Sequence, residues 1–395
     1  MTKPGYRPTG AGTRIYLSSN VYDKALDRID RIFDEFENVI VRVSGGKDST
    51  VLLHLALKVA EARKRLPLPI YWIDQEAEWQ ATVDIVTQWM ERDDVKPIWL
   101  QVPFRITNAT SQEDKWLTCW EPEREADWIH PKHPLARHEN VYGVDRLKPL
   151  FAMSIREEYG LEPVASLTGV RAQESPNRRK GLTSFLTYKD ITWGAKEFKP
   201  PGIPYAPHYL FHPIYDWGFE DVWKCIHDEG LPYNAIYDAQ YRHGIPVQKM
   251  RVSSLQHETS LYALFILQEF EPETYERMVD RIHGIDAAGK FGADDFMVTE
   301  LPFMFTDWVE YRDYLFTHLL DADTQGALGP VIREHDRKMP DWLMEAAAKV
   351  HVSAILANDR EAVKLHNWFL TPHVHQAVKE NKPFWRPKDP SGGSS

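Results

Sequence analysis

Apolar residues recur over the first hundred positions with two different spacings. Mainly apolar runs that predict buried strands stand at 39–43, 67–73 and 97–102. Patterns with helical spacing stand at 21–36, at 51–59 and from about 80 to 92. Pro97 is expected at the first position of the third strand, where a missing N–H group is tolerated. The alternation of strand and helix predicts an α/β fold with a doubly wound parallel sheet and right-handed crossovers.

The alternation of predicted strands and helices stops at residues 105–150. Trp116, Trp120 and Trp128 stand there among acidic residues, prolines and histidines, which predicts an insertion over one end of the sheet. The α/β pattern then resumes with a helix at 149–159 and a strand at 164–168. From about residue 251 the pattern is mainly helical, with predicted helices at 261–270, 275–285, 308–320 and 342–356.

These changes of pattern predict the domain organisation. They indicate an N-terminal arm at 1–20, an α/β domain at 21–250 that includes the insertion at about 105–150, a helical domain at 251–390 and a flexible tail at 391–395. A chain of 395 residues is long enough for each of the two domains to bury a core of its own.

Composition narrows the functional class. Hydrophobic residues make up 43% of the chain and charged residues 27%, which is typical of a globular protein. The net charge of −11 gives no overall attraction to nucleic acid, but it does not exclude a local basic patch that binds nucleic acid. No apolar run approaches the roughly 20 residues of a membrane span, and the first residues lack the apolar core of a secretory leader. We therefore expect a cytoplasmic protein without a membrane partner.

Only two cysteines occur, Cys119 and Cys225, and they form no CxxC pair. This count excludes a disulfide framework, a structural zinc knot and a four-cysteine iron–sulfur cluster within one chain. No iron–sulfur cofactor is expected.

The first predicted strand ends in Ser-Gly-Gly-Lys-Asp-Ser at 44–49, and a helical pattern starts at once. Gly45 and Gly46 allow the backbone to approach a ligand, because no Cβ intervenes. Unpaired N–H groups at a helix start attract an anion, and Lys47 adds a positive charge that suits phosphate. The alternative is an ordinary strand-to-helix turn rich in small residues.

Two other predicted strands end in distinctive chemistry. Asp74 follows the second strand, where its carboxylate can accept a hydrogen bond from a ribose or an adenine amino group, or can cap the next helix. After the strand at 164–168, Arg171 and Arg178 can converge on one polyanion with bidentate contacts. Glu174 between them can orient an arginine or hold Mg²⁺. The alternative for this segment is a solvated basic turn.

In this order, the three motifs resemble those of the phosphoadenosine phosphosulfate (PAPS) reductase-like family of PP-loop ATP pyrophosphatases. A fourth run fits the same family: His-Pro-Ile-Tyr-Asp-Trp at 212–217, Asp-Val-Trp at 221–223 and Leu-Pro-Tyr-Asn-Ala-Ile-Tyr-Asp at 231–238. The resemblance covers about residues 20–250. It implies an adenine nucleotide alpha hydrolase-like fold. The helical region, with Arg-Val-Ser-Ser-Leu at 251–255, resembles the immunoglobulin-binding-regulator-like branch, which has no settled reaction.

The resemblance also implies a site that binds ATP or PAPS. Its expected nucleotide ligands are Ser44, Gly45, Gly46, Lys47, Asp48, Ser49, Asp74, Gly169 and Arg171. The expected catalytic residues are Lys47, Asp48, Arg171 and Arg178, of which the cations Lys47, Arg171 and Arg178 would stabilise charge on a leaving pyrophosphate. Asp48 and Glu174 are the Mg²⁺ candidates.

Three functions remain open at this point. The first is an ATP pyrophosphatase that cleaves ATP to pyrophosphate and an adenylated intermediate, with an unknown acceptor. The second is a PAPS-dependent reductase or sulfur transferase. Reductases of the family attack with a cysteine in a C-terminal Glu-Cys-Gly-x-His motif, whereas this chain has no cysteine after Cys225, so Cys119, expected to be exposed, or an external thiol would be needed. The third is a non-catalytic nucleotide-sensing module.

The sequence says less about protein partners and metal ions than about the nucleotide site. The helical region is the expected contact surface for a protein partner, and self-association stays open. His130, His133 and His138 invite a metal hypothesis, but the neighbouring prolines make a regular presentation of ligands difficult, so a solvated loop is expected.

Overall fold

The computed structural model describes residues 18–111, 113–183, 186–197, 207–252, 255, 263–286, 300–356, 359 and 362–380. Most of the expected N-terminal arm and the whole expected tail at 391–395 lie outside these residues. The chain divides into two compact units. The α/β unit comprises Met1–Arg105 and Thr118–Ser253, and the helical unit comprises Ile106–Leu117 and Ser254–Ser395. The domain boundaries expected from the sequence stay predictions.

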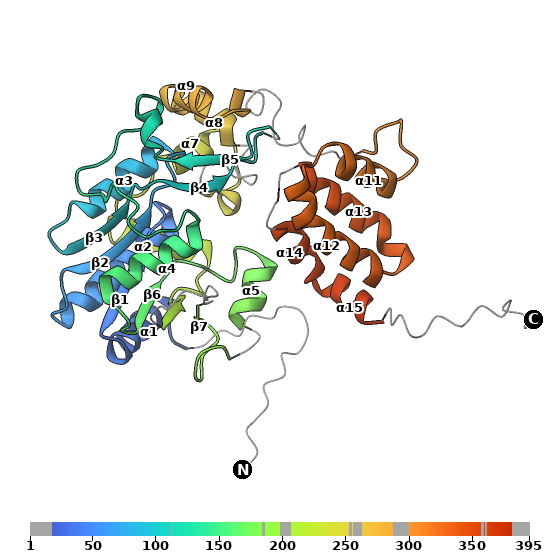
Figure 1. Ribbon diagram of the computed structural model, residues 1–395. Coiled ribbons are helices and arrows are strands. Elements are labelled where there is room, and N and C mark those ends of the chain that lie inside the picture. Colours follow the sequence, from blue (N-terminus) through green and yellow to red (C-terminus); the bar gives the residue numbers. More distant parts are fainter. Residues whose placement is uncertain are drawn as a thin grey trace, which may run out of the picture. The chain divides into compact units, whose positions relative to one another are not determined.

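The α/β unit contains one main sheet, surrounded by helices (Figure 1). Its strands are β1 (Asn38–Arg42), β2 (Leu68–Ile73), β3 (Val95–Leu100), β6 (Val164–Leu167), β7 (Gly194–Lys196) and β8 (His208–Phe211). Its helices are α1 (Val21–Glu35), α2 (Lys47–Ala62), α3 (Gln80–Met90), the 3₁₀ helix η1 (Pro122–Asp127), α4 (Leu147–Tyr159), α5 (Pro176–Thr183), α6 (Phe219–Asp228), α7 (Ile236–Arg242) and the 3₁₀ helix η2 (Val247–Lys249). A separate two-stranded sheet pairs β4 (Phe104–Thr107) with β5 (Trp116–Cys119).

The strand order of the main sheet is β3-β2-β1-β6-β8-β7. The first five strands in this order are parallel, and only β7 runs antiparallel, at one edge. The register places Val41 of β1 between Ile70 of β2 and Leu167 of β6. The predicted α/β fold with a doubly wound, mostly parallel sheet is therefore confirmed.

Helices cover both faces of this sheet. Side chains alternate between the two faces along each strand, so the apolar side chains on each face pack against a different set of helices. Val39 and Val41 share one buried core with residues of α1, α2, α3 and α6. Tyr71 points to the opposite face, where its ring packs against Phe151 and its hydroxyl lies 2.7 Å from Ser154 Oγ, both on α4. The sheet is thus buried on both sides, as the continuous apolar runs of its strands indicate.

The predicted bounds are wrong in detail at the third strand. β3 begins at Val95, so Pro97 lies inside the strand and not at its first position. The position is tolerated because β3 is an edge strand of the main sheet, where proline is accommodated within a strand. The strands β7 and β8, which complete the sheet beyond β6, carry no clear apolar alternation.

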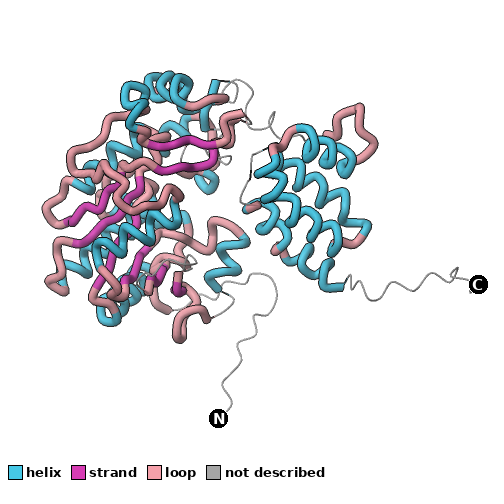
Figure 2. Tube along the Cα trace, viewed as in Figure 1, coloured by secondary structure: helices cyan, strands magenta, loops and turns pink. Residues whose placement is uncertain are grey.

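The described part of the helical unit beyond residue 262 consists of helices joined by loops (Figure 2). Its helices are α8 (Ala263–Phe270), α9 (Pro272–Arg281), α11 (Trp308–His318), α12 (Ala322–Lys338), α13 (Asp341–Leu356), α14 (Val363–Phe369) and α15 (Pro372–Glu380). The predicted helical character of this region is confirmed. Within the described residues, none of the helices has both the length and the apolar character that crossing a membrane requires.

A buried histidine pair joins α12 to α13. His335 Nδ1 lies 3.0 Å from His351 Nε2, and Arg312 Nη1 on α11 lies 3.4 Å from His351 Nδ1. Arg312 also donates a 2.7 Å hydrogen bond to Asp336 Oδ1. Burial lowers the pKa of His335 to about 4 and the pKa of His351 to about 3. Both rings are therefore neutral in the native state at neutral pH.

This pair predicts a loss of stability in mild acid. An unfolded histidine takes up a proton near pH 6.5, whereas these two stay neutral in the folded chain to well below that value, so the free energy of unfolding falls as the pH falls from 7 to 5. Urea unfolding at both pH values measures the fall. Replacing both residues, as His335→Gln with His351→Gln, should reduce it by at most about 1.4 kcal/mol per pH unit for each histidine. An equal fall in the variant would contradict the prediction.

Candidate nucleotide site

The main sheet changes winding direction between β1 and β6. From β1 the chain runs outward to β2 and β3, whereas β6 leads to β8 on the other side. Open α/β sheets bind ligands beyond the carboxyl ends of the strands at such a switch point. The predicted motif at 44–49 follows β1, and the predicted motif at 168–179 follows β6. Topology therefore brings these two motifs together (Figure 1).

The turn between β1 and α2 has the conformation that its glycines allow. Gly45 has a φ of +70°, which an L side chain rarely adopts. Gly46 is the N-cap of α2 and provides no side-chain hydrogen bond to the first turn. Ser44 is exposed, and its Oγ lies 3.4 Å from Ser49 Oγ. An exposed hydroxyl thus stands beside a helix N-terminus, which favours an anion.

Gly45 is also fixed by close packing. A Cβ at this position would lie 2.7 Å from Thr82 Cγ2 on α3. Asn234 links Gly45 and Thr82 by hydrogen bonds, since its Nδ2 donates to Gly45 O at 3.2 Å and to Thr82 Oγ1 at 2.9 Å. The turn therefore has little room to change shape.

Gly169 brings the loop after β6 against the start of α2. A Cβ at this position would lie 2.8 Å from the backbone carbonyl of Asp48 and 3.0 Å from Ser49 N. A side chain here would therefore intrude on the first-turn amides of α2. The predicted ligand Gly169 thus lies beside the predicted anion site.

Lys47 is buried and held at both ends. Its backbone N–H donates to the Tyr237 hydroxyl at 3.0 Å. Its Nζ donates to Met250 O at 3.1 Å and lies 3.4 Å from Asp48 Oδ2. Burial lowers the pKa of Lys47, although the nearby Asp48 carboxylate acts in the opposite direction.

Arg171 is buried against the same carboxylate. Its Nε donates to Asp48 Oδ1, and its Nη1 donates to Trp217 O at 3.4 Å. Only 4% of Arg171 is exposed. The structure therefore brings the predicted residues Lys47, Asp48 and Arg171 together, with both cations paired to Asp48.

Arg178 takes a different position, on α5. Half of its side chain is exposed, and its Nη1 donates to Glu174 Oε2. Glu174 Oε2 also accepts a 3.2 Å hydrogen bond from Arg171 N, so this carboxylate links the two arginine positions. The expectation that Glu174 orients an arginine agrees with these contacts.

Asp74 lies at the end of β2 and is fully buried. Its Oδ1 accepts a 2.9 Å hydrogen bond from Glu76 N, and its Oδ2 accepts one of the same length from Gln101 Nε2. His130 Nε2 lies 3.4 Å from Oδ1. The alternative of a helix cap is wrong, because α3 starts at Gln80 with Trp79 as its N-cap. The predicted contact of Asp74 with adenosine stays a prediction, and protein groups already hold both carboxylate oxygens.

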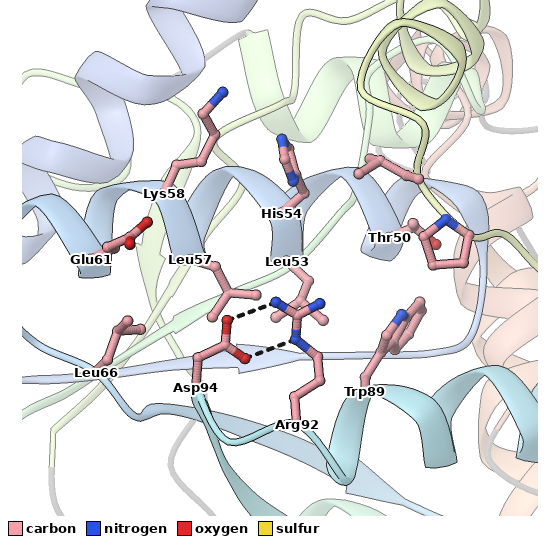
Figure 3. A pocket seen from close by; sticks show the side chains of 12 residues that line it. Thr50, Leu53, His54, Leu57, Lys58, Glu61, Leu66, Trp89, Arg92 and Asp94 are labelled. Atoms are coloured by element: carbon pink, nitrogen blue, oxygen red, sulfur yellow. Dashed lines mark hydrogen bonds and ion pairs between the residues drawn. The ribbon is translucent and has the colours of Figure 1, made fainter.

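A cavity of about 310 Å³ lies along the side of α2 (Figure 3). It is lined by Thr50, Leu53, His54, Leu57, Lys58 and Glu61 of α2, and by Leu66, Trp89, Arg92, Asp94, Leu231 and Pro232. Arg92 and Asp94 form an ion pair of 2.6 Å across one wall. None of the predicted nucleotide ligands lines this cavity, so it is separate from the candidate site.

A model of the phosphoadenosine phosphosulfate reductase domain family matches residues 38–243, just over half of the chain. The chain belongs to this family. The match spans β1 to α7 and includes all the predicted nucleotide ligands. A second model, for a domain of unknown function named DUF3440, matches residues 244–328.

Curated relatives of this family member cover much of its length. The uncharacterized protein YbdN of Escherichia coli (strain K12) is 26% identical over 293 residues, which cover 71% of this chain and 70% of YbdN. Sulfate adenylyltransferase subunit 2 of Shewanella sp. (strain W3-18-1) is 25% identical over 240 residues, which cover 59% of this chain and 70% of the relative.

Solved structures show weaker similarity. The PAPS reductase of Candida auris in its phosphate complex has 14% identity and a TM-score of 0.33, with 62% of this chain and 98% of that chain covered. The FMN adenylyltransferase of Candida glabrata has 13% identity and a TM-score of 0.35, and the match covers 55% of this chain and 58% of that chain. We draw no conclusion about substrate or reaction from these matches.

The Mg²⁺ candidates in this family member are both paired with cations. Asp48 faces Lys47 and Arg171, and Glu174 faces Arg178. A metal on these carboxylates would have to displace the cations, so the two residues as arranged do not fit a resident Mg²⁺ ion. Among the described residues, no group of three or more His, Cys, Asp or Glu side chains is arranged to hold a metal.

Neither cysteine of the chain is placed for nucleophilic attack. The expectation that Cys119 is exposed is wrong, since it is fully buried and its Sγ donates to Gln75 O at 3.2 Å. Cys225 lies on α6, and burial raises its pKa to about 11. A nucleophilic cysteine needs a lowered pKa and access to the substrate.

Two of the three histidines of the insertion that invite a metal hypothesis, His130 and His133, take part in packing, whereas His138 is exposed. His130 is buried beside Asp74, and the His133 ring stacks on Trp99 with a centroid distance of 4.7 Å. The solvated loop expected here is therefore wrong for these two residues.

Sequence reasoning missed two residues that complete the site, Asn234 and Tyr237. Both belong to the run at 231–238 that carries the family resemblance, so their presence was visible. Their contacts with Gly45 and Lys47 could not be seen in the sequence, because each contact joins two residues almost two hundred positions apart.

Gly45→Ala tests the geometry of the turn. The new Cβ would meet Thr82 at a left-handed backbone position, so we expect the free energy of unfolding to fall by at least about 1 kcal/mol and ATP affinity to fall with it. Urea unfolding and calorimetric titration with ATP measure the two effects. Gly181→Ala is the control, since a Cβ there meets nothing within 4 Å. Unchanged stability and affinity in Gly45→Ala would show that the turn does not depend on this glycine.

Proposed function

We propose that the chain binds ATP beyond the carboxyl ends of β1 and β6 and transfers its adenylyl group to an acceptor. An acceptor oxygen would form a bond to the α-phosphorus, and the bond from the α-phosphorus to the bridging oxygen would break. Pyrophosphate would then leave with that electron pair. The observation that carries the proposal is the first turn of α2, where Gly169 lies against the backbone of Asp48 and Ser49 without a Cβ, and where Gly45 gives the turn its left-handed conformation.

The names of the relatives support adenylyl transfer as the reaction class. Sulfate adenylyltransferase subunit 2 is named for adenylyl transfer, and several such relatives match more than half of the chain at 25–26% identity. We propose adenylyl transfer as the reaction class and leave the acceptor open. Placement in the immunoglobulin-binding-regulator-like branch belongs to the same proposal and draws support from the helical region.

The proposed roles follow from the positions of the side chains. The amides of α2 and the Ser44 hydroxyl would bind the phosphate oxygens. Arg178, half exposed on α5 and paired with Glu174, would approach a polyanion from the solvent side. Lys47 and Arg171 would contribute positive potential from buried positions, where a fixed charge acts strongly on a charge that develops nearby. Magnesium would arrive with the ATP substrate, and we assign it no ligand in this chain.

The second candidate, a PAPS-dependent reductase or sulfur transferase, is favoured by the family match alone. It requires a thiol to attack sulfur, and both cysteines are buried. The third candidate, a nucleotide-sensing module without turnover, differs from the first only in forming no product. A cytoplasmic location, a protein partner of the helical unit and self-association remain part of the proposal.

The reaction can be tested with ATP radiolabelled at either the α or the γ phosphate, incubated with sulfate or with small molecules from a cell extract. We expect the γ label in pyrophosphate and the α label in AMP or an adenylated acceptor. Release of orthophosphate and ADP would contradict the proposal. Binding of ATP without any product would favour the sensing module, and tighter binding of PAPS than of ATP would favour the second candidate.

Cys119→Ser separates the first candidate from the second. Adenylyl transfer uses no thiol of this chain, so the rate of pyrophosphate release should stay within about twofold of the native rate, a free-energy change of less than about 0.5 kcal/mol. The measurement needs a check by circular dichroism, because the buried thiol donates to Gln75 O. Complete loss of activity in a folded variant would point to thiol chemistry.

A further inference from the structure

The hydroxyl of Tyr237 occupies the first amide of α2. Lys47 N donates to this oxygen at 3.0 Å, and a Cβ built on Gly46 would lie 3.2 Å from it. The oxygen therefore stands directly against the turn where the proposed function places a phosphate. A neutral oxygen of the protein takes the place of a ligand oxyanion.

The surrounding contacts hold Tyr237 in this position. The residue is 3% exposed, and its ring meets the Trp223 ring edge to face at 5.4 Å. The Lys47 ammonium lies 4.9 Å from the centre of the Tyr237 ring, a cation–π distance. The same side chain thus contacts the backbone N–H and the ammonium of Lys47.

A second set of contacts ties α7 to the segment after it. Gln240 on α7 donates to Arg251 O at 2.7 Å and accepts from Arg251 N at 3.1 Å. The neighbouring Met250 carbonyl accepts from Lys47 Nζ. One element and the segment it holds therefore engage both polar ends of Lys47.

We propose that the Tyr237 hydroxyl is a place-holder that a phosphate oxygen must displace, and that it lowers the affinity of the site for oxyanions. The proposal rests on the proposed function, since it assumes that phosphate binds at α2. A charged oxygen is a stronger acceptor for an N–H group than a phenol oxygen, so it can replace the hydroxyl. Without the ligand, the hydroxyl satisfies a buried amide that would otherwise be costly to leave unpaired.

The test is calorimetric titration of the full chain and of Tyr237→Phe with inorganic pyrophosphate. The variant keeps the ring against Trp223 and Lys47 and removes only the oxygen. In the variant, Lys47 N has no protein hydrogen bond that pyrophosphate must replace. Pyrophosphate should therefore bind about two- to tenfold more tightly, the range that corresponds to one neutral hydrogen bond.

Tyr233→Phe is the matched control. Tyr233 packs on the same Trp223 ring at 5.3 Å, but its hydroxyl donates to Asp238, away from the turn, so its removal should leave pyrophosphate affinity unchanged. Adenosine, which has no phosphate, should bind the native chain and Tyr237→Phe equally.

The possible results separate this inference from the proposed function. Tighter binding of pyrophosphate by Tyr237→Phe alone supports the place-holder. Equal affinity, or weaker affinity that would make the hydroxyl a ligand, overturns it while the proposed function stands. If the native chain and both variants bind neither pyrophosphate nor ATP, the proposed function itself fails.

Discussion

The close approach of backbone segments at the first turn of α2 is the constraint on which the candidate site depends. Gly45 lies against Thr82 of α3, and Gly169 lies against the backbone of Asp48. Neither position has room for a Cβ: Gly45 lets the turn pack on α3, and Gly169 lets the loop after β6 approach the first turn of α2. The loop after β6 thus lies against the first turn of α2, where Lys47 N donates to the Tyr237 hydroxyl and an oxyanion would compete for this N–H group.

The charges around this turn depend on one another. A buried ion costs several kcal/mol unless it is paired. Asp48 lies between Lys47 and Arg171, so each of the three can be buried only with the others. Two cations and one carboxylate leave one net positive charge under the turn. The site therefore attracts an anion through a fixed potential and through backbone N–H groups, whereas Arg178 is placed to meet the ligand from the outside.

Local patterns predicted most of the α/β fold because its strands are buried on both faces. The runs at 39–43 and 67–73 correspond to β1 and β2, and the topology then brings the loops after β1 and β6 together. Other features depend on contacts that no local pattern contains. β8 has only two buried residues of four, and α12 contains Gly326, Gly329 and Pro330, which are poor helix formers. The burial of Cys119 and the pairing of Asp48 with Arg171 depend equally on residues distant in the sequence.

Family membership alone does not choose between adenylyl transfer and sulfonucleotide reduction, because backbone N–H groups donate hydrogen bonds to any phosphate-like oxygen. The nucleophile distinguishes the two reactions. Reduction requires a thiol to attack sulfur, and since the two cysteines of this chain are buried, one of them with a raised pKa, an external thiol would have to supply the attack. Adenylyl transfer requires only that the chain bind the phosphates and orient an acceptor, which brings its own attacking oxygen. A site built from amides, one exposed arginine and a buried charge trio is suited to that second task.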